Sequence, residues 1–413
     1  MTPFRGSSDQ EPMLGVEEAQ ARVLELVTPL EIEHVALQDA LHRVIAEDAV
    51  VTFDVPEGDN SAMDGYALIA DDTPGTLRVI DDIPAGAVPQ RHVERGTASR
   101  IMTGALVPEG ADAIAQVEIT DGGSEVVRVE RKVERGTHVR RRGEDMRAGD
   151  TVIVRGARIG AAEIGVLASM GQSRVAVARR PAVAILATGN EILDVGSPRR
   201  AGAVVNSNSY ALAALAREAG ADPQLRGIVG DTREATVAAL RAALDCDFII
   251  TSGGVSAGAY DFVKDAVAEL GADTRVWRVA MKPGKPVVVS RLPGGQVAFG
   301  LPGNPVSCMV AFILFVAPAI RKATGQTALF PPVVNVRLDA PLRAPGDRRS
   351  YLRVRVVARD GELVAVPMKA QGSHVSTSML GANGLAMIES GVTRIEAGEL
   401  APVLLIGNTF NGM

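Results

Sequence analysis

The residues best suited to chemistry lie in a run at 248–261, where an apolar strand leads into small and polar residues. The candidate binding residues that follow this strand are Ser252, Gly253, Gly254, Ser256, Gly258 and Asp261. Glycines let backbone N–H groups approach a phosphate or another oxyanion closely, and a helix that begins near Asp261 adds its positive N-terminal end. The pattern predicts a loop that binds an anion.

Two further loops carry the same kind of chemistry. The first contains Lys282 and Lys285, whose ammonium groups are mobile positive charges. The second, 300–307, contains Pro302 and Asn304 and places a proline at an expected first helical position. Both loops extend the predicted anion site.

Acidic and amide residues occur in loops that mostly follow predicted strands, at 188–191, 206–208 and 230–231. In an open α/β sheet, ligands bind beyond the carboxyl ends of the strands, so these loops are expected to converge on one crevice. Glu191, Asp231 and Asp261 are then expected beside the serines and glycines. This set suits Mg²⁺ with phosphate, because Mg²⁺ prefers carboxylates, waters and phosphate oxygens. Asp231 also stands three residues before Glu234, which favours helix capping as an alternative role.

Known catalytic motifs leave one competing interpretation. The sequence contains neither Gly-x-x-x-x-Gly-Lys-Ser/Thr nor a Gly-x-Gly-x-x-Gly that opens a helix after a strand. Residues 254–258 match Gly-x-Ser-x-Gly, the nucleophile elbow of α/β-hydrolases. Ser256 lies several residues beyond the strand and His374 lies in a separate predicted β tail, so a hydrolase is the less favoured alternative.

The composition predicts a large globular protein. The chain has 413 residues, of which 46% are hydrophobic, and a formal net charge of −6. This length suggests about two to four domains, and the charge argues against a general nucleic-acid-binding protein. Cys246 and Cys308 lie in apolar stretches, which favours core packing over a disulfide framework or a cysteine-rich zinc site.

The sequence predicts a cytoplasmic protein without a membrane partner. The N-terminal residues 1–10 have no apolar core of a signal peptide. The most apolar window, 306–320, is shorter than the roughly 20 residues of a membrane-spanning helix and contains Pro318. It predicts a buried helix.

The elements that must position these loops follow from hydrophobic periodicity. Helices are predicted at 16–27, 37–44 and 160–170, with short strands between 50 and 154. Strands at 182–187, 224–229, 248–251 and 275–280 then alternate with helices at 209–219, 232–244 and 262–270, before a hairpin at 287–299 and a long helix from Pro305. The tail predicts strands at 333–338, 351–357, 363–366, 385–388 and 403–406.

This pattern predicts a multidomain α/β protein with a central doubly wound α/β domain. The helices on both sides of the β-rich part are expected to form one domain, into which that part is inserted. The predicted domains are a helical and linker domain at 1–49 plus 146–179, an inserted β-rich domain at 50–145, the α/β domain at 180–328 and a small β-barrel-like domain at 329–413.

Three polar clusters lie far from the crevice loops in sequence, at 60–67, 102–105 and 140–145. Asp64 beside a glycine is also typical of a turn, and an arginine triplet is typical of a solvated face. Acid, hydroxyl and guanidinium groups nevertheless suit an oxyanion with a metal. A distant segment of this kind reaches the crevice either by folding back or from a second subunit.

In their order along the chain, these segments resemble the molybdopterin molybdenumtransferase family over nearly the whole sequence. The segments that carry the resemblance are 60–67, 103–105 with Pro108 and 110–113, 143–145, 251–261, 282–286 and 300–307. The resemblance implies an elongated homodimer of helical, β, molybdopterin-binding α/β and C-terminal β domains. It also implies that the β domain of one subunit lies near the α/β crevice of the other.

The resemblance implies a reaction in which adenylylated molybdopterin and molybdate give molybdenum cofactor and AMP, with Mg²⁺ as the divalent cation. The catalytic residues that it implies are Asp64, Asp231, Asp261, Lys282 and Lys285, and the metal-binding residues are Glu191, Asp231 and Asp261. The implied substrate-binding residues are Thr103, Asp145, Ser252, Gly253, Gly254, Ser256, Gly258, Pro302 and Asn304. Asp64, Thr103 and Asp145 are contributed across the dimer.

One position departs from the family pattern, which commonly has an acid where this chain has Asn190. Asparagine coordinates a metal through its carbonyl oxygen but contributes no charge. Two alternatives stay open: a molybdopterin adenylyltransferase, although those are one-domain chains, and a non-enzymatic scaffold of the same fold. A molybdopterin adenylyltransferase and molybdoenzyme acceptors are the expected protein partners, and no nucleic-acid partner is expected.

Overall fold

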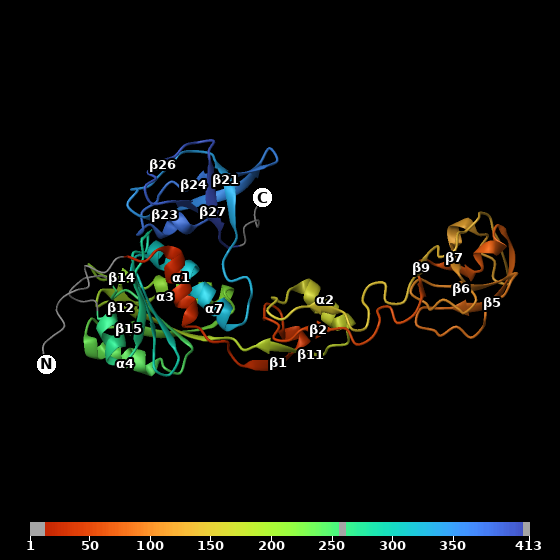
Figure 1. Cartoon of the computed structure of the whole chain (residues 1–413), viewed down its shortest axis with the longest axis horizontal. Coiled ribbons are helices and arrows are strands. Elements are labelled where there is room, and N and C mark those ends of the chain that lie inside the picture. The colour runs from red at the N-terminus through yellow and green to blue at the C-terminus, as the bar shows by residue number, and fades with distance from the viewer. Residues whose placement is uncertain (1–12, 256–261, 408–413) are drawn as a thin grey trace.

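The chain folds into packed regions that follow one another along an elongated molecule (Figure 1). The computed structural model describes residues 13–255 and 262–407. An α/β region and a β-barrel lie at one end, a small helix-and-ribbon region lies in the middle, and a β-rich domain lies at the other end. The predicted fold class is confirmed, and the boundaries of the predicted domains stay a prediction.

The α/β region is built on a mixed sheet with the strand order β15-β12-β16-β20-β19-β17. The strands are β12 (Ala182–Thr188), β15 (Asp222–Val229), β16 (Phe248–Ser252), β17 (Asp273–Arg278), β19 (Pro286–Arg291) and β20 (Val297–Leu301), with a short pair, β13 (Ile192–Leu193) and β14 (Val204–Val205), beside them. The first four strands in the sheet order run parallel, and β19 and β17 form an antiparallel edge. Because β12, β16 and β20 are buried on both faces, their sequences are apolar runs without alternation.

Helices cover both faces of this sheet, as a doubly wound fold requires. α4 (Arg233–Ala242) and α5 (Val263–Glu269) pack on one face, against Ala184, Leu186 and Ile249. The other face is covered by α3 (Asn208–Glu218), α1 (Val16–Glu25) and the helix that begins at Pro305.

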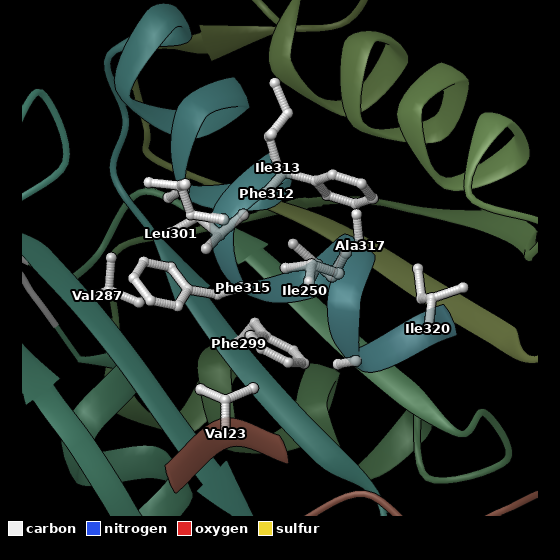
Figure 2. Close-up of a cluster of buried hydrophobic side chains, with 14 of the residues drawn as sticks. Val23, Ile250, Val287, Phe299, Leu301, Phe312, Ile313, Phe315, Ala317 and Ile320 are labelled. Carbon is white, nitrogen blue, oxygen red and sulfur yellow. The ribbon is translucent and has the colours of Figure 1, made fainter. Parts of the chain in front are cut away.

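α1 belongs to this α/β core. Its buried residues Val16, Ala19 and Val23 lie in the same hydrophobic cluster as Ile250 and Phe299, and Figure 2 shows Val23 facing Phe299. α1 thus packs against the α/β sheet and not in the hydrophobic cluster of the helix at 160–170, while the predicted grouping of the two helices in one domain stays a prediction. The apolar face of α1 is buried where it covers the sheet.

A 19-residue helix from Pro305 to Ala323 fills the centre of the core. It consists of α6 (Pro305–Ala311), a π-helical segment η4 (Phe312–Val316) and α7 (Ala317–Ala323). Phe312 and Phe315 lie among the strand residues of the same cluster (Figure 2). The helix is long and apolar enough to span a membrane, but 83% of its apolar window is buried inside the protein. The prediction of a buried helix is confirmed.

The helix continues through Pro318 for a local reason. Proline has no N–H to donate to the carbonyl of Leu314, four residues earlier. Gln20 of α1 donates its side-chain amide to that carbonyl at 3.1 Å. The preceding π-turn, in which the N–H of Ala317 donates to the carbonyl of Phe312, widens the helix where the proline ring needs room.

The middle region consists of two antiparallel ribbons and one helix. β1 (Ile32–Ala36) pairs with β11 (Arg174–Ala178), β2 (Ala49–Val50) pairs with β10 (Thr151–Ile153), and α2 (Ala161–Ser169) packs beside them. The helix predicted at 37–44 is wrong, because only the 3₁₀ turn η1 (Leu37–Asp39) forms there. His42 has a φ of 64°, which ends helical structure, and Val44 and Ile45 form β-bridges instead.

The β-rich domain contains a sheet with the order β7-β4-β6-β5-β8 and a separate β3–β9 ribbon. The elements are β3 (Asn60–Ser61), β4 (Gly65–Leu68), η2 (Ala70–Asp72), β5 (Gly75–Ile83), β6 (Thr97–Ile101), β7 (Ala113–Gln116), η3 (Val117–Ile119), β8 (Val126–Val129) and β9 (Val139–Arg140). A Cβ at Gly65 would lie 2.0 Å from the carbonyl oxygen of Ala115. Glycine is therefore required where β4 pairs with β7, directly after Asp64.

The C-terminal strands form a closed barrel in the order β23-β24-β21-β27-β25, which returns to β23. The elements are β18 (Met281–Lys282), β21 (Val333–Leu338), β22 (Leu342–Arg343), β23 (Arg349–Arg359), β24 (Glu362–Pro367), η5 (Ser376–Met379), β25 (Gly384–Ile388), β26 (Arg394–Ile395) and β27 (Leu400–Leu405). Tyr351 and Leu385 belong to the hydrophobic cluster of the α/β core. This shared packing fixes the barrel beside the carboxyl ends of the α/β strands.

Candidate active site

The carboxyl ends of β12, β16 and β20 border a cavity of about 960 Å³. The predicted site residues that line it are Glu191, Asp231, Ser252, Gly253, Gly254, Pro302 and Asn304. The other polar residues that line it are Thr188, Asn206, Ser207, Asn208, Ser307, His374 and Ser376. The topology of the sheet therefore brings together loops that are distant in sequence.

The glycine loop after β16 requires glycine at two consecutive positions. Gly253 and Gly254 have φ angles of 97° and 68°, in the left-handed region. A Cβ at either position would lie 2.8–3.0 Å from the hydroxyl oxygen of Thr188. The backbone of this loop is thus exposed to the cavity without side chains, which suits close approach by an oxyanion.

Asn208 joins two loops of the cavity. Its side-chain amide donates to the hydroxyl oxygen of Ser252 at 2.7 Å and to the carbonyl oxygen of Gly303 at 2.7 Å. The backbone N–H of Gly253 also donates to the carbonyl of Leu301 at 2.9 Å. Asn208 is not among the predicted site residues, although its position in a polar loop after a strand was a signal for it.

Asn190 and Asp231 hold each other through reciprocal hydrogen bonds. The backbone N–H of Asn190 donates to Oδ2 of Asp231 at 2.9 Å, and the backbone N–H of Asp231 donates to Oδ1 of Asn190 at 3.2 Å. Arg200 donates to the carbonyl of Asn190 at 2.5 Å. The alternative that Asp231 caps the following helix is wrong, because the hydroxyl of Thr232 accepts the N–H of Ala235.

The cavity lining contains two carboxylates, a type of ligand that suits Mg²⁺. Glu191 and Asp231 line the same cavity, and Mg²⁺ commonly takes one or two carboxylates with waters and phosphate oxygens. Within residues 13–255 and 262–407, no group of three or more His, Cys, Asp or Glu side chains is placed to hold a metal. Ser256, Gly258 and Asp261 lie outside the described residues, so the third predicted carboxylate and the nucleophile-elbow serine are not placed.

Lys282 and Lys285 are exposed and lie outside the described lining of the cavity, although Pro286 belongs to it. Lys282 is in β18, which pairs in parallel with β23 of the barrel, opposite Ser350. The lysine loop therefore lies where the α/β sheet meets the C-terminal barrel. Its predicted role in phosphate binding stays a prediction.

The C-terminal domain contributes His374 and Ser376 to the cavity. The amide of Asn304 donates to the hydroxyl of Ser373 at 3.1 Å, and the N–H of Val306 donates to the carbonyl of the same serine. His374 belongs to the C-terminal β domain as expected, but that domain is not separate from the crevice, because His374 lines the cavity. The contact between the barrel and the α/β domain is long-range in sequence, and the hydrophobic pattern gave no signal for it.

Arg353 of β23 fixes the loop that carries these residues. Its side chain is fully buried and donates to the hydroxyl of Ser378 and to the carbonyls of Ala370 and Gly372. Burial lowers the pKa of this guanidinium. Gln371 adds hydrogen bonds in both directions with the backbone of Arg353. The loop with His374 is thus tied to the barrel wall.

The cysteines are core residues, as predicted, since both are buried. Cys308 lies directly behind the cavity, where its thiol contacts the hydroxyl of Ser252 at 3.7 Å. Burial raises the pKa of the Cys308 thiol to about 12. At neutral pH this group is a neutral thiol and is unsuited to act as a nucleophile.

The remote predicted residues lie in or next to the β-rich domain, at the opposite end of the molecule from the α/β region (Figure 1). Asp64, Thr103 and Asp145 are exposed, and none of them lines the described part of the cavity of the same chain. Oδ1 of Asp64 accepts the backbone N–H of Thr103 at 2.7 Å and its hydroxyl at 2.8 Å. These hydrogen bonds lower the pKa of Asp64, the backbone bond more than the hydroxyl bond.

Comparison with known proteins relates the whole chain to one family. Residues 14–171 match the model of the MoeA N-terminal region (domain I and II), residues 184–322 match the probable molybdopterin binding domain, and residues 335–406 match the MoeA C-terminal region (domain IV). The fold resembles the molybdopterin biosynthesis MoeA protein from Pyrococcus horikosii, with a TM-score of 0.81, 31% identity, and coverage of 96% of this chain and 100% of the other.

Curated relatives are similar over their full length. The molybdopterin molybdenumtransferase of Bacillus subtilis (strain 168) is 36% identical, over 95% of this chain and 94% of the relative. Molybdopterin molybdenumtransferase 2 of Mycobacterium tuberculosis (strain ATCC 25618 / H37Rv) is 40% identical, over 94% of this chain and 98% of the relative. With matching domains in the same order and a matching fold, the chain belongs to the molybdopterin molybdenumtransferase family.

Proposed function

We propose that the chain inserts molybdenum from molybdate into adenylylated molybdopterin, which gives molybdenum cofactor and AMP. The observation that carries this proposal is the cavity at the ends of β12, β16 and β20, where a glycine loop and two carboxylates lie together in a chain related to molybdenumtransferases over its full length. Cleavage of a phosphoanhydride needs neutralisation of charge on its oxygens and does not require a protein nucleophile.

Ser252 and the backbone of Gly253 and Gly254 are the proposed contacts for the pterin and its phosphate. Lys282 and Lys285 are proposed to bind phosphate oxygens or molybdate, which is a tetrahedral dianion suited to lysine and backbone N–H groups. Lys282 and Lys285 come just before Pro286 in the chain, and Pro286 lines the cavity. The proposal therefore assigns the diphosphate to the side of the cavity that faces the C-terminal barrel.

Glu191 and Asp231 are the proposed magnesium ligands, with Asp261 as a third carboxylate from the sequence pattern. When bound, Mg²⁺ supplies positive charge near the phosphate oxygens. Asn190 holds Asp231 in place through the two hydrogen bonds between them. It contributes an amide where an acid is common in the family, so the site carries one negative charge less.

We also propose that the active enzyme is a homodimer in which the β-rich domain of one subunit completes the cavity of the other. The separation of Asp64 and Thr103 from the cavity along the molecule supports an arrangement across two subunits (Figure 1). Asp64, Thr103 and Asp145 then face the substrate from the partner side. The cytoplasm is the proposed location.

The test is AMP release by the purified full-length chain from adenylylated molybdopterin with molybdate and Mg²⁺, together with the molybdenum content of the product. Asp231→Asn is expected to lower kcat by about a hundredfold, and Lys282→Ala by at least about tenfold, because each removes charge stabilisation. The matched controls are Asp339→Asn and Lys132→Ala, whose charges are paired on the surface with Arg359 and Glu134. AMP release that is independent of molybdate, or unchanged in both site variants, would contradict the proposal.

A further inference from the structure

A second cavity lies where the helix-and-ribbon region meets the α/β region. Its volume is about 40 Å³, which is room for about three or four water-sized groups. The side chains that line it come from three segments of the middle region and its connection, at 42–44, 158 and 178–180, and from the ends of α3 and α7. The charged residues and histidine among them are His42, Arg43, Arg158, Arg179, Arg180, Glu218 and Arg321.

Two of these arginines are neutralised by carboxylates outside the cavity. Arg43 is paired with Glu33 and also donates to the carbonyl of Ala178 at 2.7 Å. Arg179 is paired with Glu31 and with Asp247. Their charges therefore require no further anion.

The other three arginines lack this compensation. Arg321 is half-buried and donates only to the carbonyl of Leu329 at 2.7 Å, and Arg158 and Arg180 make no ion pair within the described residues. Burial lowers the pKa of Arg321, and the nearby charge of Arg158 lowers it further. Glu218 is the single carboxylate in the described lining. Arg158 and Arg180 are exposed, whereas Arg321 is partly removed from water, and three uncompensated guanidinium groups around one cavity are expected to attract a counter-ion.

The position of the cavity is fixed by close backbone packing between the two regions. A Cβ at Gly156 would lie 2.7 Å from the carbonyl oxygen of Gly325, which leaves no room for a side chain there. Gly156 is two residues from Arg158, and Gly325 is four residues from Arg321. The backbone segments that carry Arg158 and Arg321 are thus held together at one junction, and both side chains line its cavity.

We propose that this junction cavity binds a small tetrahedral oxyanion, such as inorganic sulfate or phosphate, between Arg158, Arg180 and Arg321. Guanidinium groups form charge-assisted, forked hydrogen bonds with oxyanions of this shape. The bound anion joins the two regions, because Arg158 belongs to the middle region, Arg180 to the connection and Arg321 to α7. This site is separate from the proposed active site, and the inference does not depend on the proposed function.

The test is titration of the full-length chain with sulfate by calorimetry. The parent protein carries Lys282→Ala and Lys285→Ala, so that anion binding at the lysine loop is removed. Adding Arg158→Gln and Arg180→Gln is expected to weaken the remaining sulfate site by at least about tenfold, because charge-assisted hydrogen bonds are lost. Adding Arg343→Gln and Arg355→Gln instead removes the same charge from exposed arginines of the barrel and is expected to leave sulfate binding unchanged.

Thermal unfolding distinguishes two roles of these arginines, binding of an anion and direct stabilisation of the ends of α3 and α7. In sulfate-free buffer, the Arg158→Gln and Arg180→Gln variant is expected to melt no lower than the barrel control, since repulsion is relieved. Sulfate is expected to raise the Tm of the parent and the control but not that of the variant. A variant that melts lower without sulfate and still gains stability from it would overturn the proposal.

Crystals soaked in selenate give the location directly. An anomalous peak between Arg158 and Arg321 is expected, and peaks confined to other parts of the molecule would contradict the site. AMP is too large for the cavity and is expected not to compete with sulfate. Equal binding of AMP at this position would contradict the assignment to a free oxyanion.

Discussion

At the scale of single residues, Asn208 is a side chain that connects two loops of the cavity. Its amide has two N–H donors and both are used, one on the hydroxyl of Ser252 and one on the carbonyl of Gly303. Asn208 therefore adds a side-chain link between the glycine loop and the 300–307 loop, beside the backbone hydrogen bond from Gly253 to Leu301.

Asn208→Ala is expected to raise KM for adenylylated molybdopterin by about tenfold, because two hydrogen bonds of about 1 kcal/mol each no longer hold the loops together. Asn208→Asp is expected to be at least as damaging, since a carboxylate has no N–H to donate. The measurement is steady-state AMP release together with the free energy of unfolding in urea. Asn335→Ala, an exposed asparagine of the barrel, is the control, and equal effects of the two alanine variants would refute the role of Asn208.

Asp64, which lies far from the cavity of its own chain, has a pKa that is lowered by hydrogen bonds from Thr103. Both hydrogen bonds to Thr103 favour the carboxylate form and lower the pKa of Asp64. A carboxylate with a lowered pKa stabilises the folded state above its unfolded-state pKa, and this contribution is lost as pH falls through the folded-state value.

Thr103→Val is expected to raise the pKa of Asp64 toward its ordinary value without restoring it fully, because the backbone N–H of residue 103 still donates. The stabilising contribution of Asp64 is then smaller, and its loss is complete at a higher pH than in the unmodified protein. Carboxyl-carbon NMR titration of Asp64 measures this shift directly. Thr103→Ser keeps the hydroxyl and should titrate as the original; a pKa that is the same in the valine and serine variants would show that the hydroxyl has no influence.

The sequence predicts the cavity residues that lie at or just beyond the ends of strands, such as Glu191, Asp231 and Ser252, because the carboxyl ends of parallel strands meet at one edge of the sheet. It does not predict His374 or Ser376, because their placement depends on how the barrel packs against the α/β domain. The lysine loop is predicted from charge, but its pairing with β23 arises from a two-residue strand that carries no pattern of its own.

At the scale of elements, the helix from Pro305 shows a tertiary contact that replaces a missing helical hydrogen bond. Residues of α1 are almost three hundred positions away in sequence, and Gln20 nevertheless supplies the donor that Pro318 lacks. The apolar pattern predicts this helix and its burial, whereas its continuation through the proline depends on a contact from another element.

Gln20→Ala is expected to destabilise the protein by about 1 kcal/mol, because the carbonyl of Leu314 loses its partner. In a Pro318→Ala background the loss is expected to be smaller, since alanine restores the backbone N–H. The four free energies of unfolding, measured in urea, give the coupling as a double-mutant cycle. Glu25→Ala, at an exposed position of the same helix, is the control, and additive effects of the two changes would contradict this explanation.

The predicted helix at 37–44 fails at the same scale for a reason of backbone conformation. Its apolar residues have helical spacing, but in the structure Val44 and Ile45 are buried in an extended segment that forms β-bridges to residues 158 and 177. Spacing over a single helical turn or two does not separate these alternatives, because either structure buries the same residues.

At the scale of the whole molecule, the proposed dimer predicts that two inactive variants complement each other. Asp64→Asn removes the contribution of the β-rich domain, and Asp231→Asn removes a carboxylate of the cavity. In a mixed dimer, one of the two active sites then has both residues intact. Random exchange of subunits is expected to restore roughly a quarter of the original activity.

The measurement is AMP release after the two variants are unfolded together and refolded, or co-expressed with different tags. A mixture of Asp231→Asn with Lys282→Ala is the control, because both changes belong to the same side of the site and each mixed dimer contains no intact pair. Activity that stays at the level of the separate variants in the first mixture would contradict a site shared between subunits.

The paired strands β1 and β11 are the path by which the chain leaves the α/β core and returns to it. Because everything from the middle region to Asp64 is carried beyond this ribbon, it acts as the pivot of a long arm. For a rigid arm, a given rotation displaces the tip in proportion to its distance from the pivot. A small change in the twist of the ribbon therefore produces a larger displacement at Asp64. The stiffness of the ten paired residues limits the range of positions that this distant carboxylate can take.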